Sequence, residues 1–244
     1  MFQRFGEIVM SFVALILALY IALYIGSCVR YWFKNRAVWK PTTEKRLMDR
    51  QAQEPDDPKH ALNLSDLYLW RMYRSTGDNW NEQASKALEW YERAYQLTKD
   101  AERKLGMLRK LAKISYDADA DDKACRYATT LLASVKKQPN FGKGSAIHDG
   151  NMVLGLVAAK RGDVVRAREF LLKSGCTPGG PGLNSDGPNM LLAKKLLDLG
   201  EREVVLEYFA LCAIFWKMSF GSLKRWERQV RNGRTPNFGR QLIR

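Results

Sequence analysis

The stretch VLGLVAAKRGDVVRAREFLLKSG, residues 153–175, has a close counterpart in LLAKKLLDLGEREVVLEYFALCA, residues 191–213. Gly162 in the first stretch aligns with Gly200 in the second, 38 positions later, and an acidic residue follows each. On both sides of this turn apolar residues recur every three or four positions, which is the spacing of an amphipathic helix. Each stretch therefore predicts two helices joined by a short turn, and together they predict an internal repeat.

Two further copies of this pattern precede the first stretch. They are LRKLAKISYDADADDKACRYATTLL, residues 108–132, and, in a looser form, LYLWRMYRSTGDNWNEQASKALEWYERAYQL, residues 67–97. No segment shows a convincing alternation of apolar and polar residues, the pattern of a half-buried strand. The chain is therefore expected to be all-α, built from helix pairs that must stack to bury their apolar faces.

These repeated segments resemble the tetratricopeptide repeat (TPR) family. The family motif has a small residue midway along the first helix, where the second helix crosses it, and another small residue twelve positions later. The matching positions are Ala112 with Ala124, Gly155 with Ala167, and Ala193 with Val205, the last being larger than the motif expects. The resemblance covers residues 61–216. It implies an α-solenoid of about four helix pairs, curved into a right-handed stack with a concave and a convex face.

An apolar stretch near the start of the chain bears on its location. No charged residue occurs from residue 8 to residue 29, and 22 residues of helix extend about 33 Å, enough to cross the hydrocarbon core of a bilayer. The apolar part of a cleavable signal peptide is shorter, about 7–15 residues. We therefore expect residues 1–7 to form a short tail and residues 8–29 to form a single transmembrane helix.

Aromatic and basic residues follow this stretch and predict its orientation. Residues 30–60 form a basic juxtamembrane segment and linker. The residues expected to anchor it at the depth of the lipid headgroups are Arg30, Trp32, Lys34, Arg36 and Trp39. Since cations concentrate on the cytoplasmic side, we expect the N-terminus outside and the remaining chain in the cytoplasm, beside anionic lipid.

Small residues recur at every fourth position of the apolar stretch and predict close helix packing. They are Ala14, Ala18, Ala22 and Gly26. They share one side of a helix, so another transmembrane helix, or the same helix of a second copy, can approach closely. Cys28 supports a competing interpretation, in which the stretch is a bacterial lipoprotein signal, Cys28 is lipidated and the chain is an exported scaffold.

The basic charge of the chain is concentrated at its two ends. The net charge is +14, and residues 217–244 carry eight Lys or Arg and one Glu, a net charge of +7. Within this segment Leu223, Trp226 and Val230 are spaced to cover the last helix pair as a capping helix. The tail beyond them is expected to be mobile. A basic tail also permits an alternative function, the binding of RNA or the ribosome.

Residues suited to catalysis or metal binding are scarce. The chain has two histidines, His60 and His148, and no pair of cysteines with the spacing of a zinc site. Asp149 follows His148, but adjacent side chains on a helix point in different directions, so the two do not predict a base and its orienting acid. We therefore expect no enzyme activity, no cofactor and no metal.

The resemblance to TPR proteins implies a binding groove lined by the first helix of each pair. Carried over position by position, the groove residues are Arg109, Lys113 and Tyr116 in the second copy, Met152 and Leu156 in the third, and Lys194 in the fourth. Such a groove has basic and apolar parts and suits a peptide that presents carboxylates beside an apolar anchor. The leading hypothesis is a membrane-anchored adapter that binds a protein partner at the cytoplasmic face.

The segment SGCTPGGPGLNSDGPNM, residues 174–190, separates the last two copies and is rich in Gly and Pro. This composition predicts a shaped loop. Two interpretations remain open: a contact loop beside the groove, or a spacer in which Pro188 starts the next helix at its first position.

Overall fold

The computed structural model describes residues 41–137 and 142–242. The chain divides into two units, Met1–Pro55 and Asp56–Arg244, and the division falls within the sequence EPDDP. In the first unit the described helix is α2 (Pro41–Gln53). It ends in a turn in which the side-chain amide of its residue 51 donates a hydrogen bond to the carbonyl of residue 55, at 3.0 Å.

Among the described residues, no helix is long and apolar enough to cross a membrane. The longest, α4 (Asp78–Leu97), carries six charged residues in its 20 positions. The expected fold class combined a transmembrane helix with the helical repeats, and this finding contradicts it. Over the described residues the fold is all-α and contains no transmembrane helix. The stretch 8–29 lies outside the described residues, as do the other residues assigned to it or to its flank: Ala14, Ala18, Ala22, Gly26, Cys28, Arg30, Trp32, Lys34, Arg36 and Trp39.

The second unit is built from helices that pack in consecutive pairs. In chain order they are α3 (Pro58–Met72), α4 (Asp78–Leu97), α5 (Ala101–Asp117), α6 (Asp121–Lys137), α7 (Lys143–Lys160), α8 (Val164–Gly175), α9 (Pro181–Ser185), α10 (Leu191–Asp198), α11 (Arg202–Phe215), α12 (Ser222–Arg231) and the short 3-10 helix η1 (Gly239–Leu242). Helix α3 packs on α4, α5 on α6, α7 on α8 and α10 on α11, and each pair also contacts the next pair along the chain.

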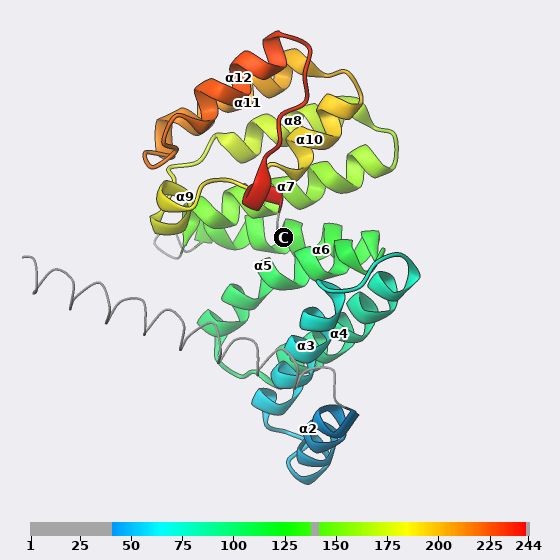
Figure 1. Cartoon of the computed structure of the whole chain (residues 1–244). Coiled ribbons are helices and arrows are strands. Elements are labelled where there is room, and N and C mark those ends of the chain that lie inside the picture. The colour runs from blue at the N-terminus through cyan, green and yellow to red at the C-terminus, as the bar shows by residue number, and fades with distance from the viewer. Residues whose placement is uncertain (1–40, 138–141, 243–244) are drawn as a thin grey trace, which may run out of the picture. The chain divides into compact units, whose positions relative to one another are not determined.

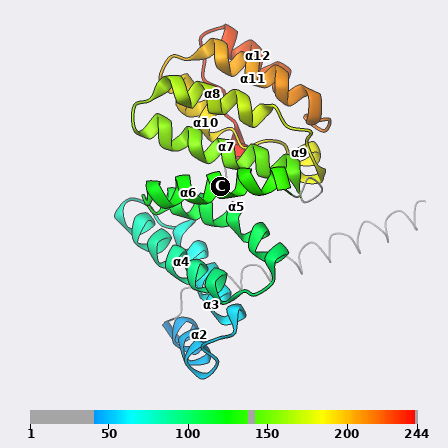
Figure 2. The same ribbon diagram turned by 180° about the vertical axis from the view of Figure 1, so that it is seen from behind.

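This succession of pairs is visible from both sides of the molecule (Figures 1 and 2). It confirms the prediction of an all-helical, repeat-like stack. Each helix leaves one apolar face that only a neighbouring helix can cover, so the pairs bury that surface by stacking in chain order. Helix α10 is much shorter than the other first helices, because the segment before it is folded into α9 and its flanking loops.

A residue in the left-handed backbone conformation lies in the turn of every pair described. These residues are Gly77, Asp119, Gly162 and Gly200, with φ of 62°, 55°, 78° and 85°. Gly adopts this conformation without steric cost, and Asp tolerates it better than most residues. In the third pair the next residue, Asp163, accepts a hydrogen bond from the backbone N–H three positions on, at 3.0 Å, and so caps α8. In the third pair the Gly-acid motif is therefore a turn followed by a side-chain helix cap, whereas Glu201 in the fourth pair lies at the N-cap of α11 without a side-chain capping bond.

Close approach between helices explains the small residues at the repeat positions. A Cβ added to Gly155 on α7 would overlap the side chain of Leu192 on α10 and lie 3.0 Å from the Cβ of Phe170 on α8. Ala167 and Ala193, at the equivalent crossing points, are fully buried. Gly155 is thus a place where three helices meet, and the other two small positions are buried as the motif expects.

Helix α12 closes the C-terminal end of the stack. Leu223, Trp226 and Val230 are 7 %, 2 % and 1 % exposed, which confirms the predicted capping face. Apolar residues at these spacings lie on one side of the helix, so α12 covers the last pair and turns its charged side outward.

The segment after α12 folds back onto the stack, so the prediction of a mobile tail is wrong. Phe238 is 1 % exposed, and its ring lies 5.0 Å from the ring of Trp226. Further along, the Met190 backbone N–H donates to the Gln241 carbonyl at 2.8 Å. In Figure 1 the red segment accordingly runs from α12 back alongside α10 to α7. The buried Phe238 ring and the partly buried Leu242 side chain anchor a segment that is otherwise rich in basic and polar residues.

Candidate functional site

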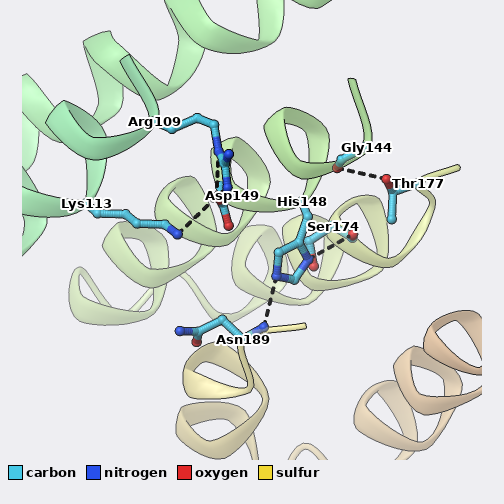
Figure 3. A network of polar contacts seen from close by, with 8 residues as sticks. All are labelled: Arg109, Lys113, Gly144, His148, Asp149, Ser174, Thr177 and Asn189. Atoms are coloured by element: carbon cyan, nitrogen blue, oxygen red, sulfur yellow. Dashed lines mark hydrogen bonds and ion pairs between the residues drawn. The ribbon is translucent and has the colours of Figure 1, made fainter. Parts of the chain in front are cut away.

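A buried carboxylate, Asp149 on α7, lies between two cations of α5 (Figure 3). Its side chain is 6 % exposed. Arg109 donates from Nε and Nη2 to Asp149 Oδ2, at 2.9 and 2.6 Å, and Lys113 Nζ lies 3.0 Å from the same oxygen. Arg109 and Lys113 are four positions apart and therefore share one face of α5. This network joins the second helix pair to the third.

The electrostatic environment keeps Asp149 ionised. Burial alone would raise the pKa of this carboxyl, but the neighbouring charges of Lys113 and Arg109 outweigh it, and the pKa falls from 3.8 to about 2. Arg109 and Lys113 remain 42 % and 30 % exposed. Each cation therefore forms an ion pair with Asp149, and part of its side chain remains in contact with solvent.

The neighbouring His148 is fully buried and points away from α5. Its Nε2 accepts a hydrogen bond from the Asn189 N–H at 3.1 Å, so the proton is on Nδ1, which lies 3.3 Å from the Ser174 carbonyl. Desolvation lowers the pKa of this imidazole below 6.5, and the ring is neutral near pH 7. The expectation that His148 and Asp149 point in different directions is confirmed, because Asp149 contacts Arg109 and Lys113 while His148 contacts Asn189 and Ser174 (Figure 3).

The loop after α8 is held tightly against the start of α7. Thr177 Oγ1 donates to the Gly144 carbonyl at 2.8 Å (Figure 3). A Cβ added to Gly144 would overlap the Gly179 backbone. The segment continues into α9, where Pro181 occupies the first turn, and α10 begins only at Leu191. Pro188 therefore does not occupy the first position of a helix, as the spacer interpretation expected.

A cavity of about 320 Å³ opens over this network. Helices α5 and α7, the segment 182–189 and the C-terminal tail all contribute to its walls. Its charged lining residues are Arg109, Lys113, Asp149, Asp186 and Arg240. Three cations against two carboxylates leave a net positive charge, and the neutral His148 forms part of the floor.

A smaller apolar notch of about 20 Å³ adjoins the cavity. Tyr116, Met152 and Leu156 line it, and Lys113 and Asn189 border both spaces. The three apolar residues are 7 %, 2 % and 4 % exposed, so they offer only their outer edges. A charged cavity and an apolar notch therefore lie side by side along the first helices of the second and third pairs.

The structure brings together five of the six groove residues expected from the sequence. Lys194 is the exception, because it lines neither space. It lies on α10, where its Nζ is 2.7 Å from Asp198 in an exposed i,i+4 ion pair. Helices α5, α7 and α10 all border these two spaces, but α10 does so through Leu191 and not through the expected Lys194.

Three charged lining residues were not identified from the sequence as part of this site. Asp149 comes 40 positions after its partner Arg109, and nothing local links them. Asp186 and Arg240 reach the cavity through the loop and the tail, and Gln241 Nε2 ties the two together by donating to the Asp186 carbonyl at 2.8 Å. The Gly/Pro composition of the loop was the one available signal, and it left the contact-loop and spacer interpretations both open.

The described site is poorly arranged for proton transfer. Both ring nitrogens of His148 face backbone partners, and Asp149 is held as a carboxylate by two cations. Cys212 is buried, and desolvation raises the pKa of its thiol. Donors that remain exposed beside an apolar notch are suited to binding a ligand.

No protein-family model matches the chain, and no curated protein matches it significantly.

Proposed function

We propose that the helical unit Asp56–Arg244 is a TPR-like adapter that binds a peptide segment of a protein partner. The pairwise stacking and the small residues at the helix crossings support a TPR-like arrangement. In such a stack the first helices of successive pairs lie next to one another. A ligand that contacts α5 and α7 together therefore meets two repeats at once.

The observation that carries this proposal is the charged cavity joined to the apolar notch through Lys113. A peptide with an acidic side chain next to a small apolar side chain matches both. The acidic group would meet the free donors of Arg109, Lys113 and Arg240, and the apolar group would cover the edges of Met152 and Leu156. Asp149 already neutralises much of the charge of Arg109 and Lys113. Of the three cations that line the cavity, the exposed Arg240 is therefore the one whose charge is least neutralised by a neighbouring carboxylate.

The test uses peptide phage display on the full-length protein, followed by fluorescence anisotropy with the enriched peptides. Acidic peptides with an apolar neighbour should be enriched. Arg240→Glu should weaken their binding at least tenfold, because a charge pair of this kind contributes about 1.5–3 kcal/mol. Arg240 is exposed, so the fold should be unaffected. Reversing Arg109 or Lys113 instead would place a carboxylate against the buried Asp149 and would confuse loss of binding with unfolding.

Lys194→Glu is the matched control. Lys194 is a partly exposed cation of the same stack that lines neither space. Its reversal should leave the affinity unchanged. Equal losses in the two variants would mean that the overall charge, not the cavity, determines binding. No effect of Arg240→Glu on any enriched peptide would place the binding site elsewhere.

A further inference from the structure

The end of α11 and the turn that joins it to α12 expose three apolar side chains. Ile214, Met218 and Phe220 are 66 %, 49 % and 85 % exposed and lie within seven residues of one another. Phe220 has a φ of 46°, a left-handed conformation that is costly for an aromatic residue, and Gly221 follows with a φ of 78°. Such strain persists only where the surrounding structure holds it, and here it projects an aromatic ring into solvent.

The turn is anchored rigidly at its base. Trp216 is 4 % exposed, and its Nε1 donates to the Ser185 carbonyl at 3.3 Å. The Met218 backbone N–H donates to the Asn184 carbonyl at 3.2 Å. A Cβ on Gly187 would overlap the Trp216 ring. The exposed side chains are therefore presented by a supported turn, so little conformational entropy is lost when they contact a partner.

Cations surround this apolar group. Lys217, Lys224, Arg225 and Arg228 are exposed, and none of them forms an ion pair within the described part of the chain. Glu227, the one acidic residue of this segment, is engaged by Arg231 at 2.9 Å. The charged side of α12 therefore presents a net positive field next to the apolar turn, while Trp226 and its neighbours keep the opposite side of the helix in the core.

We propose that this turn and the outer face of α12 form a docking surface for an anionic lipid bilayer. The apolar side chains would enter the boundary between headgroups and acyl chains, and the four cations would lie at the depth of the phosphates. The chemistry favours lipid over RNA. Ile214 and Met218 have no aromatic face on which a base can stack, so a nucleic acid would leave them in water.

Hydrogen exchange of the full-length protein, followed by mass spectrometry, tests this surface locally. Vesicles with 30 % phosphatidylserine should slow the exchange of amides in 216–224, and pure phosphatidylcholine vesicles should slow it much less. Because the readout is confined to the turn, contact of another part of the chain with the vesicles does not imitate the result. Equal protection by both vesicle types, or none by either, would overturn the proposal.

Two double variants separate the apolar and charged contributions. Phe220→Ser with Met218→Ser should abolish the protection. Lys224→Glu with Arg225→Glu should raise the lipid concentration needed for half-maximal protection at least about 25-fold, since each cation near an anionic leaflet strengthens binding about fivefold. The controls change exposed residues elsewhere: Val165→Ser on α8, and Lys99→Glu in the link before α5 combined with Arg103→Glu in its first turn. Loss of protection in the controls would contradict the assignment.

A third arm replaces the vesicles with a homopolymeric RNA of the same phosphate concentration. Protection of the turn by RNA, with none by anionic vesicles, would also overturn the membrane proposal and assign the surface to nucleic acid. Protection by the vesicles and not by RNA is the expected result.

Discussion

Asp149 shows how a single side chain links two repeats. Its pKa falls from 3.8 in the unfolded chain to about 2 in the folded protein, so the folded state releases its proton more readily. The resulting stabilisation is complete above about pH 4 and is lost as the pH falls toward about 2; it amounts to about 2 kcal/mol. Asp149→Asn should therefore lower the free energy of unfolding by about this amount at pH 7.

The measurement is urea denaturation of the wild type and Asp149→Asn at several pH values. The difference between the two proteins should shrink between pH 4 and pH 2, because the wild-type carboxyl then becomes protonated as well. Asp198→Asn serves as the control, since Asp198 is half-exposed in its pair with Lys194 and such pairs contribute less than about 1 kcal/mol. A difference at Asp149 that is independent of pH would show that its charge does not stabilise the fold.

At the scale of the helix, the crossing of α7 with α8 and α10 depends on the absence of a side chain at Gly155. A valine there would overlap Leu192 and press against Phe170. Gly155→Val should therefore lower the free energy of unfolding by about 2 kcal/mol, within the usual cost of overpacking, even though it removes a flexible residue from a helix.

The comparison for this prediction is Ala133→Val on the exposed side of α6. It adds the same β-branched side chain where nothing is crowded, so it should cost no more than about 0.7 kcal/mol, the helix-propensity difference. Thermal unfolding monitored by circular dichroism distinguishes the two. Equal effects would mean that α7 shifts freely and that its small residue is not required for the crossing.

The same helices show what sequence patterns can predict. The pairs, their turns and the capping face of α12 follow from apolar spacing within about 40 residues, and these features are present. The positions of Arg109 and Lys113 on a first helix also followed from the repeat. Their ion pair with Asp149 did not, because contacts between repeats leave no periodic trace in the sequence. Helix α9 was missed for a related reason, since it has five residues and no period.

At the scale of the whole second unit, the C-terminal segment was the largest departure from expectation. Charge dominates its sequence and favoured a mobile tail, but one ring, Phe238, packs between Phe209 and Trp226 and outweighs that tendency. By fixing the backbone that follows, this ring also positions Arg240 on the wall of the cavity. The end of the chain therefore closes the last helix pair and completes a site formed mainly by the second and third pairs.

Phe238→Ala should release this segment as a unit. The substitution leaves a cavity beside Trp226 and should lower the free energy of unfolding by about 3 kcal/mol. It should also increase the exchange rate of the Met190 amide, whose acceptor is the Gln241 carbonyl. Hydrogen exchange and urea denaturation measure the two effects. The matched control is Phe220→Ala, which removes a ring that is 85 % exposed and should change stability by less than about 0.5 kcal/mol. If the Met190 amide stays protected in Phe238→Ala, the other contacts of the tail, among them the Gln241 side chain on the Asp186 carbonyl, are enough to hold it, and the buried ring is not what positions Arg240.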